Sequence, residues 1–329
     1  MTVTAPGNAP MTDTDAPSPI LAIDIGGTKL AAALVDRHGA VLRRAEARTP
    51  AAPPGEHLVA DALIGLANQV VGDACPQAIG LASAGPLDIG AGTVSPVNIP
   101  SWRDFPLRDT VAAAFPGAQT VLVGDAVAAA VGEHWQGAGS GAASMLGIVV
   151  STGVGGGLIL DGRVYPGPTG NAGHFGHIPT DLEPVRCACG MTGCVEALAS
   201  GPSMVRWALS QGWRGGEPAA GLDARALAGD AGAGDTLALA AFDRAADALA
   251  CGIVGAAALV DLDVVVVGGG VAAAGKVLLD PLQAHLRRRA SLDFVKRVRA
   301  LTGTLGRDAG LIGAARCAQL ARSSAAATA

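Results

Sequence analysis

The chain of 329 residues contains the same succession of predicted elements twice. Each copy is an apolar strand, a glycine-rich loop, a second strand, a tight turn and a third strand. The first copy spans residues 20–47 and has the loop Ile25–Lys29, and the second spans residues 145–165 and has the loop Thr152–Gly157. This repeat predicts two related α/β units, each with a glycine loop that follows a strand.

Two such loops could hold one polyphosphate from opposite sides through their backbone N–H groups. One loop alone would be a weak signal, because glycine turns are common in hairpins. A third glycine run, Gly268–Gly270, follows the apolar strand Asp263–Val267 and, with Ala273, matches the pattern G-x-G-x-x-A. The acidic residue that a dinucleotide fold requires about twenty positions later falls among the arginines 287–289. We therefore expect this strand end to approach a nucleotide base or ribose, and the pattern G-x4-G-K-[ST] is absent.

Hydrophobic spacing predicts further elements. The other strands are expected at Ala78–Ser83 and Thr120–Val123, and Asp125 directly follows the second of them. The expected helices are Gly55–Val71, Ala126–Trp135, Pro202–Leu209, Ala224–Leu227, Asp235–Val260, Pro281–Arg289 and Gly310–Leu320.

The segment 173–196 holds three of the six cysteines and two of the six histidines. Cys187, Cys189 and Cys194 form the pattern C-x-C-x4-C, and His177 lies just upstream. Three thiolates and one imidazole are a ligand set for a closed structural zinc site. The alternative is three unrelated buried thiols and a core histidine. His174 and Glu196 remain beside this cluster as polar groups that the loop could present to a ligand.

Composition excludes several classes of protein. The formal net charge of −5 argues against a nucleic-acid partner, because proteins that bind nucleic acids usually have more basic than acidic residues. The N-terminal residues have no signal-peptide pattern and are expected to be a disordered lead, and no apolar run is long enough for a membrane span. The other three cysteines, Cys75, Cys251 and Cys317, are expected to be buried small apolar residues. These features predict a soluble, cytoplasmic protein.

Taken together, these motifs resemble the ROK family of sugar kinases and regulators, whose fold is that of the actin-like and hexokinase-like ATPases. Asp24–Lys29 resembles the first phosphate loop of the family, Ser151–Gly157 the second, and Gly268–Gly270 the adenosine segment. The resemblance implies a two-domain α/β fold built from duplicated ribonuclease H-like domains with a zinc-binding loop. We expect a disordered lead at residues 1–19, a small domain at 20–125 completed by a helix at about 310–322, and a large domain at 126–309 with the zinc loop at 173–196.

The resemblance also implies roles for individual residues. Asp125 is the expected catalytic base, Asp24 the indirect partner of Mg²⁺, and His177 a residue that serves both zinc and sugar. The expected contacts of ATP are Asp24, Gly26, Gly27, Thr28, Lys29, Ser151, Thr152, Gly153, Gly155, Gly156, Gly268, Gly269 and Gly270. The expected contacts of the sugar are Gly85, Asn98, Asp125, His174, His177 and Glu196. Lys29 has an equally good alternative as a solvated strand residue.

Within the family, the segments Leu21–Val35, Ala172–His177 and Thr192–Gly201 resemble the bacterial N-acetylmannosamine branch. Glucokinases of the family usually carry glutamate where this chain has His174, and the family usually carries asparagine where it has Gly124. We expect phosphorylation of the 6-hydroxyl of N-acetylmannosamine, with a glucokinase as the alternative. A DNA-binding regulator would need a domain ahead of Ile20, and a non-catalytic sugar sensor would not need Asp125 and both loops. The resemblance further implies a homodimer.

Overall fold

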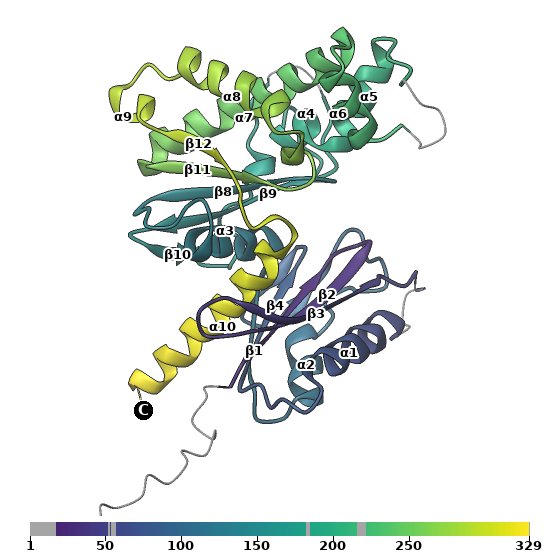
Figure 1. The fold of residues 1–329 in the computed structure, drawn as a ribbon, viewed down its shortest axis with the longest axis vertical. Helices are drawn as coiled ribbons and strands as arrows, with labels where there is room; N and C mark the ends of the chain where they lie inside the picture. Colours follow the sequence, from purple (N-terminus) through teal and green to yellow (C-terminus); the bar gives the residue numbers. More distant parts are fainter. Residues whose placement is uncertain (1–17, 52, 54–56, 182–184, 216–221, 329) are drawn as a thin grey trace, which may run out of the picture.

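The computed structural model contains two five-stranded sheets, which lie one above the other in Figure 1. It describes residues 18–51, 53, 57–181, 185–215 and 222–328. The strands of the first sheet are β3 (Val41–Arg48), β2 (Lys29–Val35), β1 (Ile20–Ile25), β4 (Ala78–Ser83) and β7 (Gln119–Gly124), in that order. Those of the second are β10 (Arg163–Tyr165), β9 (Val154–Leu160), β8 (Met145–Val150), β11 (Val264–Gly268) and β12 (Arg299–Thr302).

The two sheets share one topology. In each, three consecutive strands form an antiparallel meander, a fourth strand pairs in parallel with the first, and a fifth pairs in parallel with the fourth. This confirms the duplication that the repeated pattern predicts. A separate two-stranded ribbon, β5 (Leu87–Asp88) with β6 (Thr93–Val94), follows β4.

Helices cover the outer face of each sheet. The first sheet is covered by α1 (Leu58–Val71) and α2 (Leu107–Ala114). The second is covered by α4 (Val195–Ala199), α5 (Gly201–Ser210), α6 (Ala224–Gly232), α7 (Thr236–Val260), α8 (Lys276–Arg289) and α9 (Asp293–Lys296). Short 3₁₀ turns among the described residues include η2 (Phe175–His177), η4 (Ala272–Ala274) and η5 (Gly306–Asp308).

The alternation of β1 shows how sequence fixes the layers. Leu21, Ile23 and Ile25 pack toward α1 and α2, whereas Ile20 and Ala22 point to the other face. Large side chains therefore build the outer core, and small ones leave room for a close inner helix layer.

The inner layer consists of α3 (Asp125–Gln136) and α10 (Ala309–Thr328), which lie between the sheets in Figure 1. Their backbones meet at glycines. A Cβ at Gly132 would stand 2.3 Å from the Ala309 carbonyl oxygen, and one at Gly313 would stand 1.6 Å from that of Ala128. Neither distance is possible for a real side chain, so only glycine permits this approach.

The structure corrects several predicted boundaries. α8 begins at Lys276 rather than Pro281, because buried Leu278 and Leu282 hold a helix that one missing proline N–H does not break. α10 continues to Thr328 instead of ending near residue 322. The elements α2 and β12 were not expected, and β12 is a four-residue edge strand with little apolar pattern.

The predicted division into domains is not decided by these elements, because α3 packs against both sheets. The boundaries at residues 125 and 309 therefore stay a prediction. The predicted disordered lead lies, except for residues 18 and 19, outside the described residues. None of the helices that the structure describes is long and apolar enough to cross a membrane.

We predict that Gly313→Ala lowers the free energy of unfolding by about 2 kcal/mol or more, the usual scale of overpacking. The new methyl group would overlap the Ala128 carbonyl unless α3 and α10 separate. Urea unfolding measures this change. Gly255→Ala is the matched control, because a Cβ at this exposed position of α7 meets nothing within 4 Å. Gly255→Ala should leave the free energy of unfolding unchanged or raise it by up to about 1 kcal/mol, because alanine favours a helix more than glycine does. Equal effects of the two substitutions would contradict the packing argument.

Candidate active site and metal centre

Two carboxylates lie close enough for the charge of one to act on the other, where the inner helix layer meets the first sheet. Asp24 lies near the end of β1, and Asp125 is the first residue of α3, directly after β7. The parallel register places Asp24 level with Ala82 of β4, and Ala82 level with Val123 of β7. Burial and then the charge of Asp125 raise the pKa of Asp24 to about 6. Neighbouring Lys29 and Arg44 oppose this rise more weakly.

Asp125 is also a perturbed carboxylate. Solvent reaches part of the residue, yet the protein around its carboxylate raises the pKa of Asp125 above the usual range. A hydrogen bond from the Ala126 N–H, 2.7 Å long, and the nearby His174 both act in the opposite direction. A carboxylate with a raised pKa is a stronger base, and its proton affinity lies nearer to neutral pH.

His174 is held in one tautomer by the backbone. Its Nδ1 lies 2.8 Å from the Asn171 carbonyl oxygen, which can only accept, so Nδ1 carries the proton. In the neutral ring Nε2 is then an acceptor. A Cβ at Gly85 would stand 3.8 Å from this Nε2, so Gly85 and His174 border the same space beside Asp125.

The first glycine loop lies against Asn98. A Cβ at Gly27 would come within 2.6 Å of three side-chain atoms of Asn98, so the loop passes this side chain as bare backbone. Thr49 fixes the loop by donating from Oγ1 to the Gly26 carbonyl, at 2.7 Å. Lys29 instead donates from Nζ to Glu46, at 2.7 Å, and its side chain is about half exposed.

The second glycine loop is anchored by Glu196. Its Oε2 accepts from the Val154 N–H at 2.9 Å, and a Cβ at Gly153 would overlap that oxygen at 2.7 Å. The predicted loop Thr152–Gly157 is too long, because residues 154–157 belong to β9 and pair with β8. A Cβ at Gly155 would lie 2.6 Å from the Ala126 Cβ, which places this part of β9 beside the start of α3.

The third glycine run joins the second loop. Gly269 has φ +93°, and its Cβ would lie 2.4 Å from the Val150 carbonyl oxygen at the end of β8. A Cβ at Gly270 would lie 3.8 Å from the Ser151 hydroxyl. The strand end at Gly268 and the loop at Ser151 thus form one glycine-lined edge.

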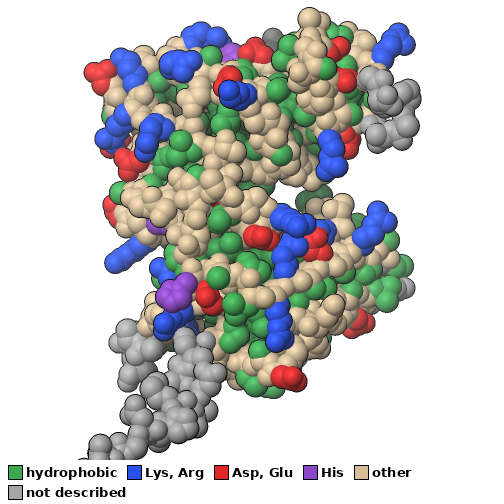
Figure 2. All heavy atoms as spheres, viewed as in Figure 1, with side chains coloured by type: hydrophobic (Ala, Val, Ile, Leu, Met, Phe, Trp, Pro, Cys, Tyr) green, Lys and Arg blue, Asp and Glu red, His purple; other side chains and the backbone are tan. Residues whose placement is uncertain are grey.

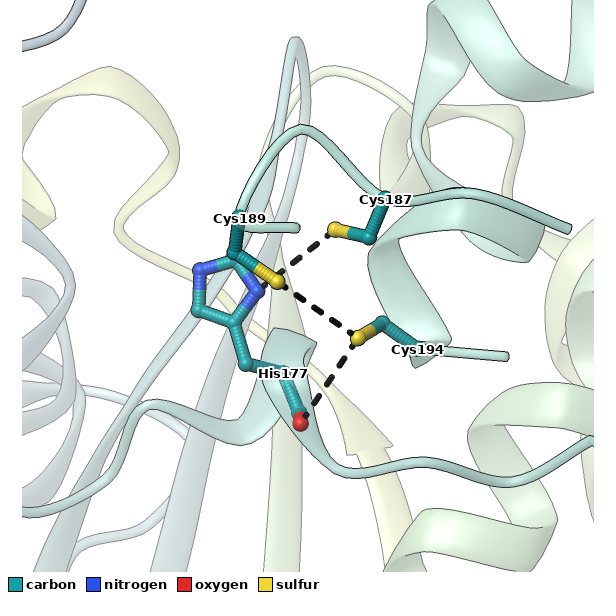
Figure 3. Close-up of side chains that lie close together, drawn as sticks. All are labelled: His177, Cys187, Cys189 and Cys194. Atoms are coloured by element: carbon teal, nitrogen blue, oxygen red, sulfur yellow. Dashed lines mark hydrogen bonds between the residues drawn. The ribbon is translucent and has the colours of Figure 1, made fainter. Parts of the chain in front are cut away.

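The cysteine cluster is gathered around His177, as Figure 3 shows. One ligand atom from each of His177, Cys187, Cys189 and Cys194 lies within 4.8 Å of all the others. The distance from His177 Nδ1 to Cys187 Sγ is 3.8 Å, and that from Cys189 Sγ to Cys194 Sγ is 3.8 Å. A tetrahedron with metal–sulfur bonds of about 2.3 Å has edges of about 3.8 Å. The four donors therefore fit a tetrahedral metal such as zinc.

This cluster adjoins the polar groups of the site. The His174 and His177 ring centroids lie 6.1 Å apart, and the Cys187 thiol lies 3.9 Å from Glu196 Oε1. Among the remaining cysteines, Cys317 is buried and Cys251 partly buried, whereas Cys75 is exposed. The expectation that Cys75 is buried is therefore wrong, because it lies in the loop after α1 rather than in a core element.

The predicted site residues thus fall into adjoining groups. One contains Asp24, Asp125, Gly85 and His174, and another contains His177, Glu196 and the second loop. Lys29 is the exception, since its side chain is paired with Glu46 on the neighbouring strand. The sequence did not indicate that Asn171 orients His174, and no side-chain pattern could, because a backbone carbonyl makes the contact. Figure 2 shows the surface hollowed between the two lobes, on the right.

The family model for the ROK family matches residues 20–321. This chain belongs to the ROK family. An N-acetylmannosamine kinase of Shigella flexneri is 40% identical over 301 residues, which cover 91% of this chain and 98% of that protein. A glucokinase of Thermotoga maritima is 31% identical over 308 residues, 90% of this chain and 96% of that protein.

Solved structures agree with the fold. The ROK family glucokinase from Streptomyces griseus, in complex with glucose and AMPPNP, has a TM-score of 0.79 and 33% sequence identity. The match covers 92% of this chain and 99% of that one. The predicted ROK resemblance is confirmed, and so is the predicted likeness to hexokinase-like ATPases at the level of the fold.

We predict that Asp24→Asn stabilises the metal-free protein at pH 7 by up to about 3 kcal/mol. The folded protein raises the pKa of Asp24 from 3.8 to about 6, so folding favours its protonated form. The protonated form of Asp24 therefore contributes fully to stability below pH 3.8, and this contribution is lost as the pH rises to about 6 and the carboxyl ionises. The gain from Asp24→Asn should therefore vanish near pH 3.8. Asp109→Asn, at a carboxylate that is 69% exposed, is the control. A gain that is independent of pH would contradict this origin.

We predict one zinc ion per chain and its loss in Cys189→Ser, measured by elemental analysis. Cys189 is one of the four converging donors, whereas exposed Cys75 lies outside the cluster. Cys75→Ser should therefore retain the metal. Zinc loss should also weaken sugar binding, because His174 and Glu196 adjoin the cluster. Purified protein without zinc, but with unchanged kinetics, would refute this prediction.

Proposed function

We propose that this chain is an ATP-dependent kinase that phosphorylates the 6-hydroxyl of N-acetylmannosamine. The observation that carries the proposal is the position of Asp125, a carboxylate of raised pKa between the glycine loops and His174. Membership of the ROK family and the identity of 40% to an N-acetylmannosamine kinase support it.

In the proposed reaction, Asp125 accepts the proton of the sugar hydroxyl as its oxygen attacks the γ-phosphorus of ATP. The bond from that phosphorus to the bridging oxygen breaks, and ADP leaves. Phosphoryl transfer depends mainly on positioning and on neutralising charge. The two glycine loops would supply backbone N–H groups to the phosphates, and the glycine-lined edge at Gly268–Gly270 would admit the adenosine.

A magnesium ion fits beside Asp24. Burial raises the pKa of Asp24 most, the negative charge of Asp125 raises it further, and a divalent cation would offset that repulsion. Bound with ATP, Mg²⁺ would neutralise phosphate charge. Asp24 would hold it indirectly, and Lys29 would have to leave Glu46 before it could contact a phosphate.

Zinc is proposed as the metal of the cysteine cluster. Nδ1 of His177 faces the thiols, so metal binding there leaves the proton on Nε2. That N–H can donate to a sugar hydroxyl, which would give His177 a role toward both metal and substrate. A homodimer and a cytoplasmic location stay predictions, and sedimentation of the purified protein would test the first.

His174 is the proposed determinant of the substrate. Its Nε2 can accept from a hydroxyl or from the N–H of an acetamido group, and the neutral ring adds no third negative charge beside Asp24 and Asp125. A glutamate here would bring a carboxylate into that space. We therefore expect kcat/KM for N-acetylmannosamine to exceed that for glucose by at least about tenfold, or about 1.4 kcal/mol.

A coupled ATP assay with glucose, mannose, N-acetylmannosamine and N-acetylglucosamine tests this proposal. His174→Glu should narrow or reverse the preference, and His174→Gln is the neutral control. Asp125→Asn should lower kcat by at least about a hundredfold while retaining binding of an ATP analogue. Near-normal turnover of Asp125→Asn would remove Asp125 from the mechanism.

A glucokinase is the second candidate, favoured by the similarity to the Thermotoga maritima and Streptomyces griseus enzymes. A higher kcat/KM of the wild type for glucose than for N-acetylmannosamine would favour the glucokinase. Gly124 would then be the residue to explain, because it supplies no polar side chain to the sugar. The apolar Leu87 lies nearby instead, with its Cδ1 3.5 Å from where a Cβ of residue 124 would be.

A further inference from the structure

Glu133 is a buried carboxylate outside every predicted site. It lies in the last turns of α3 and is 5% exposed. Its Oε2 accepts from the N–H groups of Ala138, at 3.0 Å, and Thr304, at 3.1 Å. Its Oε1 accepts from the Leu305 N–H at 2.9 Å, and the Thr304 hydroxyl donates to Oε2 at a longer distance of 3.4 Å. Backbone donors from two distant loops thus converge on both oxygens.

Two glycines make room for this carboxylate. A Cβ at Gly137 would stand 2.0 Å from Oε2, and one at Gly303 would stand 2.7 Å from Oε1. Neither residue has the left-handed backbone that glycine favours. Glycine is therefore needed at both positions because a side chain would overlap the carboxylate. We call the loop segments 137–138 and 303–305, which surround the Glu133 carboxylate, the cradle.

The cradle joins the two places where the chain passes between the sheets. The first passage is α3, which leads from β7 to β8. The second is residues 303–308, which lead from β12 to α10. Glu133 belongs to the first passage and binds the backbone of the second, so it fixes one against the other.

Each passage lies next to one of the two carboxylates of the active site. Asp125 begins α3, and Gly310, in the first turn of α10, would place a Cβ 3.0 Å from Asp24 Oδ2. Leu305 is only a few residues before that turn. Movement of this segment would therefore change the surroundings of Asp24 relative to Asp125.

We propose that Glu133 is a positioning residue, which holds the start of α10 against α3 and thereby sets the geometry between Asp24 and Asp125. This inference rests on the proposed kinase function. Glu133 touches no substrate, so its removal should impair phosphoryl transfer more than sugar binding. The expected sugar contacts Asn98 and His174 lie on neither passage.

The test uses the full-length, zinc-loaded protein. Glu133→Gln replaces one acceptor oxygen with an amide donor, which leaves at least one backbone N–H unpaired. It should lower kcat at least about tenfold, with the KM for sugar changed less than twofold. Gly303→Ala keeps the carboxylate but crowds it, and should act in the same direction. Their effects should be less than multiplicative when combined, because both act through one cradle.

Two comparisons separate positioning from a general loss of fold. Thr304→Val removes only the weak hydroxyl contact and should lower kcat less than threefold, and Gly255→Ala is the glycine control. Hydrogen exchange should be at least tenfold faster at residues 303–312 in Glu133→Gln and Gly303→Ala than in the wild type, without a similar change in α7. This measurement needs no activity, so it also stands if the wild type phosphorylates no sugar, which would refute the proposed function instead.

Unchanged kcat in both folded variants would overturn the proposal. Equal losses in kcat and sugar affinity would overturn it as well, because they would indicate a global defect. Unchanged exchange at residues 303–312 would show that the cradle does not hold α10.

Discussion

The backbone contact between α3 and α10 is the constraint on which the rest of this structure depends. Gly132 and Gly313 allow the two helices to touch without intervening side chains. The sheets approach the same layer equally closely. A Cβ at Gly80 of β4 would lie 2.0 Å from the Ala314 carbonyl oxygen, and one at Gly147 of β8 would lie 2.4 Å from the Ala130 Cβ. Four glycines therefore define a thin central layer that belongs to both halves.

This layer brings the carboxylates of Asp24 and Asp125 close together, which lowers the stability of the fold. Burial disfavours the charged forms of Asp24 and Asp125, and the charge of Asp125 adds to this effect at Asp24. A structure selected for stability alone would separate or pair them. Their proximity would suit the proposed magnesium ion, whose positive charge would offset the repulsion. Glu133 shows the opposite solution, since its buried charge is met by backbone donors from two loops.

Much of this arrangement follows from the sequence, because its signals are local. Apolar runs ending in glycine predicted the strands and loops, and cysteine spacing predicted the donor set of His177 and the three thiols. What could not be predicted depends on contacts between distant segments. The pairing of Lys29 with Glu46 requires the register of β2 and β3. The role proposed for Glu133 requires one loop that lies 171 residues away in the sequence, and β12 is a strand chiefly because β11 offers it an edge.

The position of α10 has a consequence for how the protein is made. This last helix supplies Leu311, Ala314 and Ala318 to the inner core of the first sheet, where they meet Ala22 and Ala33. The strands of the first sheet therefore keep part of an apolar face uncovered until the residues of α10 leave the ribosome. Nearly the whole second half must be translated, and much of it folded, while that face waits. A chain that ends before α10 would leave this apolar face of the first sheet exposed, which favours association with other unfinished chains.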